Sequence, residues 1–368
     1  MGVRVGEIVE ALESFAPVEL TEKWDNVGLQ VGDLDWEVDA ALVSLNTDMS
    51  VLEEAKEAGA GMVVSHHPLI FGELKRVTAE GEPGRTIMAA LERRIAVYAA
   101  HTNADCASGG ASDLLADGLG LIQCRPLRAS RAKKEVKLVT FVPEKDVEAV
   151  RKAVCDAGAG VIGEYRDCSF RVEGRGTFFG TEGTEPVVGR KGRLEEVAEW
   201  RLEVVVPSAK VLEVVSALIE SHPYETPAYD VYPLSPSSCE AGLGRIGMLP
   251  KPMKVSELVK RTKRLLGLES VWIAGERGAV VEKVAVCAGG GGELLKDAVE
   301  QGAEAYVTGD VKYHTAREAA AAGIVLVDVG HAASELPAVR WLAEELEKRV
   351  PAVRFLVSEV EVEPFTEL

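Results

Sequence analysis

The chain has 368 residues, which is too long for one ordinary domain and predicts two or three. Its 47% hydrophobic content suits globular cores, and a formal net charge of −18 argues against nucleic-acid binding through a broad basic face. No apolar run reaches the length of a membrane span, and the first residues lack a signal-peptide core. We therefore expect a cytoplasmic protein that does not associate with a membrane.

The six cysteines are scattered along the chain, and none belongs to a C-x-x-C pair. In a chain of this length they indicate free thiols of a reducing compartment and not a disulfide framework. They are Cys106, Cys124, Cys155, Cys168, Cys239 and Cys287.

Both ends of the chain alternate short apolar strands with amphipathic helices. In the first third we expect strands at 40–45, 62–65 and 95–100, and helices at 51–58, 85–94 and 112–119. In the last third we expect strands at 284–287, 305–307, 324–327 and 353–357, and helices at 293–300, 315–322 and 336–349. Continuous apolar strands separated by helices indicate sheets covered on both faces, hence an α/β fold.

The middle of the chain has a different pattern. We expect a strand at 137–142, a helix at 146–155, an exposed antiparallel strand or hairpin within 165–179, a strand at 201–206, a helix at 211–220 and a strand at 229–232. The order β-α-β-β-α-β is that of a ferredoxin-like unit. Its two halves begin alike, which suggests a weak internal duplication. Residues 233–247 are expected to be the linker back to the α/β fold.

Five of the six histidines fall in four segments that end predicted strands. These histidines are His66, His67, His101, His314 and His331, and each segment also carries a carboxylate or a second histidine. A single buried histidine is more often a hydrogen-bonded core group than a ligand. Five of them at four strand ends, beside carboxylates, predict a divalent metal site. Imidazole and carboxylate together favour Zn, Fe, Mn or Co over Mg or Ca.

The spacing of these residues favours two ions. Adjacent side chains on a strand point to opposite faces, so His66 and His67 suit two different ions. His331 and Glu335 share a helix face if the helix starts near His331. Asp105 could bridge the two ions. Because the histidine segments lie in both ends of the chain, the two ends must pack together and the middle must be an insertion.

Four other features have two readings each. The Gly289–Gly292 loop between a strand and a helix could hold an anion or form only a tight turn. The Trp24–Gly32 segment could be a substrate-side loop or a turn packed by its tryptophan. Cys106 is read as a buried small residue in preference to a ligand. His222 has no neighbouring histidine, so a structural role is expected.

Five segments together resemble the Nif-three-like family, whose members are often called GTP cyclohydrolase 1 type 2 homologues. The segments are Trp24–Gly32, Ser65–Phe71, His101–Asp105, Gly309–His314 and Gly330–Glu335. The resemblance extends over nearly the whole chain. It implies that His66, His67, Asp105, His331 and Glu335 are metal ligands, and that His101 and His314 lie beside the metals as candidate catalytic groups.

The resemblance also implies an architecture. Two similar α/β domains would enclose a dinuclear metal site and assemble as a toroidal homohexamer. The expected domains are the N-terminal half of the metal-binding core (1–127), an inserted ferredoxin-like domain of the PII or CutA type (128–235) and the C-terminal half of the core (236–368).

Two functions follow as hypotheses. The first is a hydrolase with two divalent ions per chain, zinc first among Zn, Fe, Mn and Co, that acts on a small cytosolic substrate such as a nucleotide or heterocycle. The second is a metal-binding regulatory or scaffold protein without turnover, whose inserted domain senses a ligand. The substrate, the native metal and the role of the inserted domain do not follow from the sequence.

Overall fold

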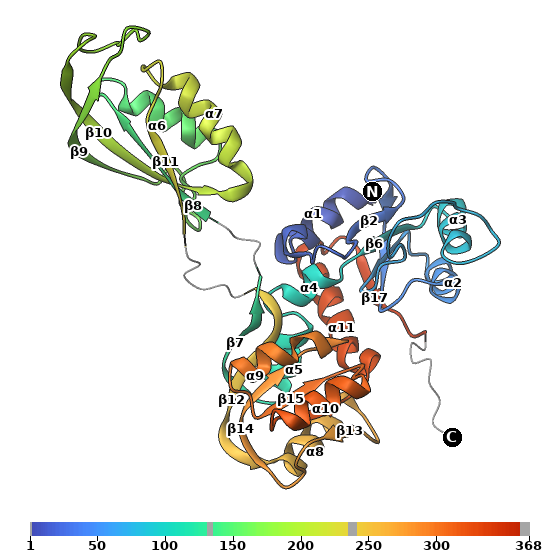
Figure 1. The fold of residues 1–368 in the computed structure, drawn as a ribbon. Coiled ribbons are helices and arrows are strands. Elements are labelled where there is room, and N and C mark those ends of the chain that lie inside the picture. Colours follow the sequence, from blue (N-terminus) through green and yellow to red (C-terminus); the bar gives the residue numbers. More distant parts are fainter. Residues whose placement is uncertain (1, 131–134, 235–240, 361–368) are drawn as a thin grey trace. The chain divides into compact units, whose positions relative to one another are not determined.

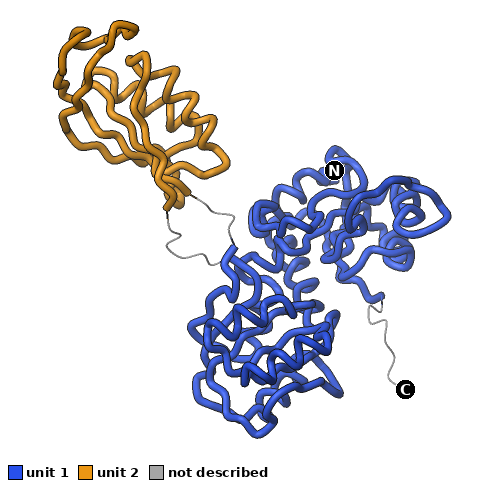
Figure 2. Tube along the Cα trace, viewed as in Figure 1, with its two compact units in different colours: residues 1–130, 239–368 blue, residues 131–238 orange. Residues whose placement is uncertain are grey.

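The computed structural model describes residues 2–130, 135–234 and 241–360. The chain forms two compact units: unit 1 comprises residues 1–130 and 239–368, and unit 2 comprises residues 131–238 (Figure 2). The expected insertion started at 128 and ended at 235, three residues before unit 2 at each end. Cys239 and residues 235–240 of the expected linker lie outside the described residues.

The first sheet of unit 1 has five strands in the order β17-β4-β5-β6-β2 (Figure 1). Its strands are β17 (Arg354–Val357), β4 (Ala40–Ser44), β5 (Met62–Ser65), β6 (Ala96–Ala99) and β2 (Gly28–Val31). All pairs are parallel except that of β2 with β6. Alternate residues of β4–β6 pack against α1 (Val5–Phe15) and α11 (His331–Arg349) on one face, and against α2 (Met49–Glu57) and α3 (Gly84–Glu92) on the other.

The second sheet of unit 1 has six strands in the order β13-β16-β15-β14-β12-β7. Its strands are β13 (Trp272–Ala274), β16 (Val325–Asp328), β15 (Ala305–Thr308), β14 (Val280–Val286), β12 (Gly242–Lys254) and β7 (Ile122–Ala129). The three strands β14, β15 and β16 are parallel. One face packs on α5 (Ala111–Gly118) and α8 (Val255–Leu266), and the other on α9 (Leu295–Glu300) and α10 (Tyr313–Ala321). Both sheets are therefore covered on two faces, as expected from their apolar strands.

The two ends of the chain are interleaved in unit 1. Strand β7 comes from the first third but pairs with β12 in the second sheet, and β17 comes from the last third but pairs with β4 in the first sheet. The remaining short elements of unit 1 are the pair β1 (Val3–Arg4) and β3 (Glu37–Val38), the helix α4 (Thr102–Cys106), and the 3₁₀ helices η1 (Val18–Leu20) and η3 (Gly291–Leu294).

Two expectations for the last third are corrected. The segment 233–247 is not a linker throughout, because β12 begins at Gly242. The last long helix begins at His331 and not at 336, with Pro337 inside it. A proline ring removes a helix hydrogen bond and is best tolerated in the first turn, but Pro337 lies beyond the first turn of this helix and does not mark its start.

Unit 2 has the element order β-α-β-β-α-β. Its elements are β8 (Glu135–Val142), α6 (Val147–Asp156), β9 (Ser169–Phe179), β10 (Leu194–Pro207), the 3₁₀ helix η2 (Ser208–Lys210), α7 (Val211–Ser221) and β11 (Tyr229–Pro233). The sheet is antiparallel in the order β11-β8-β10-β9, and α6 and α7 pack together on one face (Figure 1).

The described cysteines Cys106, Cys124, Cys155, Cys168 and Cys287 are free thiols, as expected. Within the described ranges, no helix combines the length and the apolar character needed to cross a bilayer.

Candidate metal centre

The candidate centre lies at the carboxyl ends of the parallel strands of unit 1. Ser44, Ser65 and Ala99 are in register at the ends of β4, β5 and β6, so the residues that follow these strands meet at one edge of the sheet. His66 and His67 follow β5, and His101 follows β6 and precedes α4, which carries Asp105. Ligands of open α/β sheets gather at this edge.

The second sheet contributes the start of α11. Gly330, between β16 and α11, has φ 78° and ψ 157°, a conformation that essentially only glycine adopts. This turn makes His331 the first residue of the helix. Glu335 then lies one turn further on the same face, and the His331 Nε2–Glu335 Oε2 distance is 3.1 Å.

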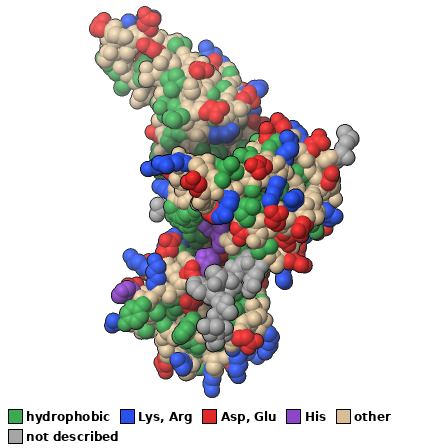
Figure 3. Space-filling view, turned by 90° about the vertical axis from the view of Figure 1, so that its right-hand side faces the viewer, with side chains coloured by type: hydrophobic (Ala, Val, Ile, Leu, Met, Phe, Trp, Pro, Cys, Tyr) green, Lys and Arg blue, Asp and Glu red, His purple; other side chains and the backbone are tan. Residues whose placement is uncertain are grey.

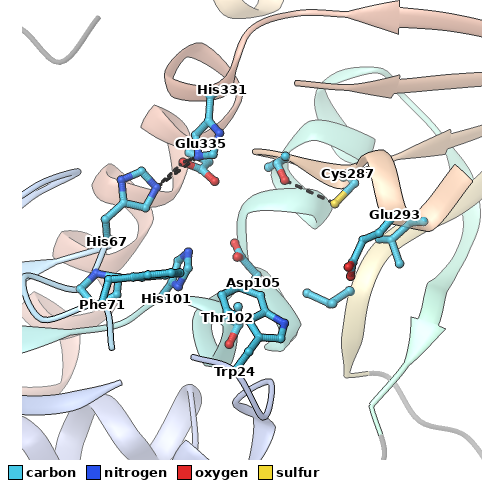
Figure 4. Close-up of a pocket in the computed structure, with 16 residues that line it drawn as sticks. Trp24, His67, Phe71, His101, Thr102, Asp105, Cys287, Glu293, His331 and Glu335 are labelled. Carbon is cyan, nitrogen blue, oxygen red and sulfur yellow. Dashed lines mark hydrogen bonds and ion pairs between the residues drawn. The ribbon is translucent and has the colours of Figure 1, made fainter. Parts of the chain in front are cut away.

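Glu335 is the point where the histidines converge. Its Oε2 lies 3.0 Å from His67 Nε2, and its Oε1 lies 3.8 Å from His66 Nε2. His66 Nε2 is also 3.5 Å from Asp105 Oδ1. Figure 4 shows His67, His331 and Glu335 close together, with Asp105 and His101 projecting into the same pocket. The five expected ligands thus lie in one cluster.

Each histidine of the cluster is fixed by its Nδ1 atom. His66 Nδ1 lies 2.9 Å from the Ala100 carbonyl oxygen, and His67 Nδ1 lies 2.7 Å from Asn46 Oδ1. Carboxylates hold the other two histidines.

His101 Nδ1 lies 2.8 Å from Asp25 Oδ1, and His331 Nδ1 lies 2.6 Å from Asp310 Oδ2. All four Nδ1 partners are acceptors, so each Nδ1 donates and each neutral ring presents its Nε2 lone pair. This arrangement is the usual outer shell of metal-ligating histidines.

The Nε2 lone pairs of these histidines point at other hydrogen-bond acceptors, so no hydrogen bond can form between them. His67 Nε2 and His331 Nε2 are 3.3 Å apart, and both approach the same carboxylate oxygen. Within this cluster, three buried atoms of the described chain lack a hydrogen bond of normal geometry: His66 Nε2, Asp105 Oδ1 and Glu335 Oε2. Buried acceptors that face one another require a cation between them, either protons or metal ions. The donor set therefore fits divalent transition metals.

The pKa values reflect the same charge arrangement. Burial alone would lower the pKa of His66, but the charges of Asp105 and Glu335 outweigh it and raise this pKa to about 9. The close contact with the Glu335 carboxylate raises the pKa of His331 to about 9. Despite burial, the close approach of the His331, His66 and His67 rings holds the pKa of Glu335 well below its usual range. Protons take the cation's place when no metal is bound.

The two candidate catalytic histidines are placed differently. His101 lines the pocket, and its ligand atom lies within 4.8 Å of those of His66 and His67. His314 is the second residue of α10, is exposed, and packs edge-on against Tyr313 with ring centroids 5.4 Å apart. His314 is not among the residues that line the pocket.

The Gly289–Gly292 loop packs against the cluster. The backbone N–H of Gly289 donates to Ser334 Oγ, and that of Gly291 donates to Thr308 Oγ1, so both donors are used within the protein. A Cβ atom on Gly289 would stand 2.0 Å from Glu335 Oε1. The glycine therefore leaves the room that the Glu335 carboxylate occupies.

A cavity of about 400 Å³ opens over the cluster, and Figure 3 shows histidine side chains gathered in a hollow of the surface. Trp24 and Phe71 line this cavity and are 55% and 65% exposed. Both rings lie against the ring of His101. Trp24 is thus at the cavity wall (Figure 4) and does not pack a turn from within.

Sequence reasoning did not assign the residues that orient the histidines. Asp310 lies in the Gly309–His314 segment and Asp25 in the Trp24–Gly32 segment, but neither position indicates which histidine the carboxylate faces. Asn46 had no signal, because only the fold brings the loop after β4 next to His67. Cys106 is buried, and His222 uses both ring nitrogens in hydrogen bonds to Phe141 and Tyr224, as expected of structural residues.

Fold and site define an α/β protein with a histidine–carboxylate cluster at its strand ends. The sequence model of the Duf34/NIF3 (NGG1p interacting factor 3) family matches residues 3–364, so the chain belongs to this family. A "GTP cyclohydrolase 1 type 2 homolog" of Bacillus subtilis is 39% identical over 98% of this chain and 97% of its own length. The homologue of Halalkalibacterium halodurans is 38% identical with the same coverage.

Solved structures show the same relationship. A Bacillus cereus protein described as related to NIF3 is 38% identical, with a TM-score of 0.77 and full coverage of both chains. A Staphylococcus aureus protein is 27% identical, with a TM-score of 0.85 over 100% of this chain and 99% of its own. The similarity therefore includes the insertion as well as the core.

Proposed function

We propose that unit 1 binds two divalent transition-metal ions and hydrolyses a small cytosolic substrate, a nucleotide or another heterocycle. The observation that carries this proposal is the set of buried, unpartnered acceptor atoms on His66, Asp105 and Glu335. The ligands would be His66, His67, Asp105, His331 and Glu335. Five ligands exceed what one tetrahedral catalytic ion with an open position uses, so two ions are expected, with zinc first among Zn, Fe, Mn and Co.

When bound, the ions would lower the pKa of coordinated water toward ~7 and so supply hydroxide at neutral pH. His101 is the group best placed to move a proton. Its Nδ1 is held by Asp25, whose pKa, despite burial, is lowered to about 2 by the hydrogen bond with His101. Asp25 therefore stays a carboxylate, and His101 presents Nε2 to the cavity.

His314 is the second proposed catalytic residue, but it lies outside the cavity lining within the described chain. A role for it requires rearrangement or a second copy of the chain. The proposal therefore assigns the first proton transfer to His101.

The proposal is tested by screening the purified protein against pooled metabolites, with His101→Asn as the key variant. A proton-transfer role predicts unchanged metal content and about 10²–10⁴-fold slower turnover. Loss of metal would instead make His101 a ligand. A wild-type rate would remove it from the reaction. Wild-type protein that turns over no pooled compound while fully metal-loaded would contradict the hydrolase proposal.

The proposal extends to assembly, location and unit 2. Resemblance to the family supports a toroidal homohexamer, which light scattering on the purified protein tests. The scattered free cysteines support a location in the cytoplasm. The order β-α-β-β-α-β with an antiparallel sheet supports a ferredoxin-like fold of the PII or CutA type for unit 2.

The alternative is a metal-binding regulatory or scaffold protein without turnover, in which unit 2 senses a ligand. The observation that favours it is a second cavity that lies wholly within unit 2. A sensor would bind a metabolite saturably and release no product, whereas a hydrolase would release one.

A further inference from the structure

Unit 2 has a cavity of about 480 Å³ at the end of its sheet. Its walls come from β9, from the 184–188 segment that follows it, from β8 and β10, and from the 224–228 segment that precedes β11. The backbone N–H of Glu185 donates to Glu225 Oε2 at 3.1 Å and joins the two segments that border the cavity. A volume of this size accommodates a small organic molecule.

The walls are largely apolar and aromatic. Phe141, Phe178 and Phe179 line the cavity together with Tyr224, and Pro186 and the neighbouring valines complete the apolar lining. Aromatic faces carry a negative quadrupole and attract cations. They also supply a large contact area for an apolar ligand body.

The charged groups at the cavity are not balanced. Arg175, the only basic residue among the described residues that line it, forms an ion pair with Glu196. Glu199 also lines the cavity but forms no ion pair with any described Lys, Arg or His. Beside it, the Tyr224 hydroxyl is shielded from solvent, and burial together with the neighbouring Glu199 carboxylate raises the pKa of this tyrosine. A half-buried carboxylate without a cation favours binding of a positive group.

Glu199 is placed by a glycine. A Cβ atom on Gly176 would stand 2.1 Å from Glu199 Oε2, so the carboxylate lies over the bare backbone of β9. Two residues earlier, a Cβ on Gly174 would meet only the Glu199 carbonyl oxygen at 3.9 Å, an ordinary contact. A side chain at Gly176 would therefore collide with the Glu199 carboxylate, whereas a small side chain at Gly174 would fit.

We propose that this cavity binds a small organic amine, with the ammonium group held by Glu199 and the aromatic faces and the apolar body against the phenylalanines. An organic anion fits poorly, because Arg175 is already paired. A hard metal ion fits less well, because such ions need several converging oxygen ligands, and Glu225, another carboxylate of the lining, already accepts a hydrogen bond from the Glu185 N–H. The site is distinct from the candidate metal centre, since every lining residue belongs to unit 2.

The test uses fluorine NMR on the full-length, metal-loaded protein. The probes are 4-fluorophenethylamine, its neutral analogue 4-fluorophenethyl alcohol and the anion 4-fluorophenylacetate. The amine is expected to bind saturably, with a dissociation constant of roughly 1 mM or tighter. The alcohol and the acid are expected to bind at least about tenfold more weakly. Equal binding of all three, or no saturable binding of the amine, overturns the proposal.

Two variants locate the binding. Glu199→Gln removes the charge, and Gly176→Ala displaces the carboxylate without burying a new polar group. Each is expected to weaken amine binding at least about tenfold, while metal content is unchanged.

Their matched controls are Glu173→Gln, an exposed residue of β9, and Gly174→Ala, and both are expected to bind like wild type. Because Gly176→Ala displaces only the flexible end of Glu199, it keeps the test valid if Glu199→Gln folds poorly. Wild-type affinity in both Glu199→Gln and Gly176→Ala would exclude this cavity as the amine site.

Discussion

Glu335 is one of two largely buried carboxylates that face His66 in the histidine cluster. It is 3% exposed, and both of its oxygens face ring nitrogens. Glu335→Gln keeps the shape of the side chain but removes the charge that would offset two dications. We expect loss of most bound metal with the fold retained, measured by elemental analysis and thermal melting.

The matched control for this change is Glu344→Gln, an exposed residue of the same helix. It should keep wild-type metal content. Full metal occupancy in Glu335→Gln would mean that Glu335 is not a ligand.

Protons and metal ions should compete for the histidine nitrogens. The pKa values of His66 and His331 are raised to about 9 in the metal-free chain, so both rings carry a second proton at pH 7.5. A ligating histidine must be neutral, so metal binding should release up to about two protons per chain. The release should fall as the pH rises through about 9.

Calorimetry in buffers of different ionisation enthalpy measures this proton release. A binding enthalpy independent of the buffer at pH 7.5 would show that no protons leave, and would contradict the proposed role of these two histidines.

At the residue scale, the sequence indicates which residues form the cluster but not which acceptors orient the histidine rings. The sequence predicts His66, His67, Asp105, His331 and Glu335 as ligands, and the structure brings them together. The acceptors behind the rings could not be derived, because Asp25 and Asn46 reach their histidines only through tertiary packing.

The loop between β14 and α9 packs against the Glu335 carboxylate and limits its position. Gly289 has φ 66°, and a Cβ there would stand 2.0 Å from Glu335 Oε1. Gly289→Ala should therefore cost about 1–2 kcal/mol for the left-handed backbone and also displace the carboxylate. We expect lower stability together with loss of metal.

Gly323→Ala separates these two effects. Gly323 also has a left-handed backbone, with φ 76°, but a Cβ there would meet no atom within 4 Å. It should lower stability by a similar backbone term of about 1–2 kcal/mol and keep the metal. Equal metal content in the two variants would show that Gly289 does not hold room for Glu335.

At the element scale, periodicity predicted the buried strands well and failed where prolines and glycines lie within elements. Strand β12 contains Pro250 and Pro252, and its register with β14 shifts between Met248 and Met253, where the prolines need donate no ladder hydrogen bond. Helix α11 contains Pro337 and begins at His331, before its predicted start at 336. Tertiary packing overrides these local signals.

The two ends of unit 1 between which unit 2 is inserted lie next to each other. Ala129 of β7 is paired with Gly242 of β12, and the Ser130 N–H donates to the Ala241 carbonyl oxygen at 3.0 Å. Replacing 131–240 with Asn-Gly should therefore join β7 and β12 in a two-residue hairpin. We expect a folded, metal-binding protein without amine binding at Glu199, measured by circular dichroism, elemental analysis and fluorine NMR.

A longer Gly/Ser linker of about six residues is the control for strain in the hairpin turn. Insoluble or metal-free protein with both connections would show that unit 2 is needed to fold unit 1. At this scale the sequence indicated an insertion, because the histidine segments lie on both sides of it. It did not indicate that β7 and β17 exchange sheets, since strand pairing depends on distant contacts.

The central claim is that the cluster of unit 1 is a transition-metal centre. The most direct measurement is elemental analysis of the purified full-length protein, desalted after reconstitution with Zn, Fe, Mn or Co. We expect about two ions per chain in the wild type and well under one in Glu335→Gln. Retention of only Mg or Ca, or of no metal after each reconstitution, would contradict the claim.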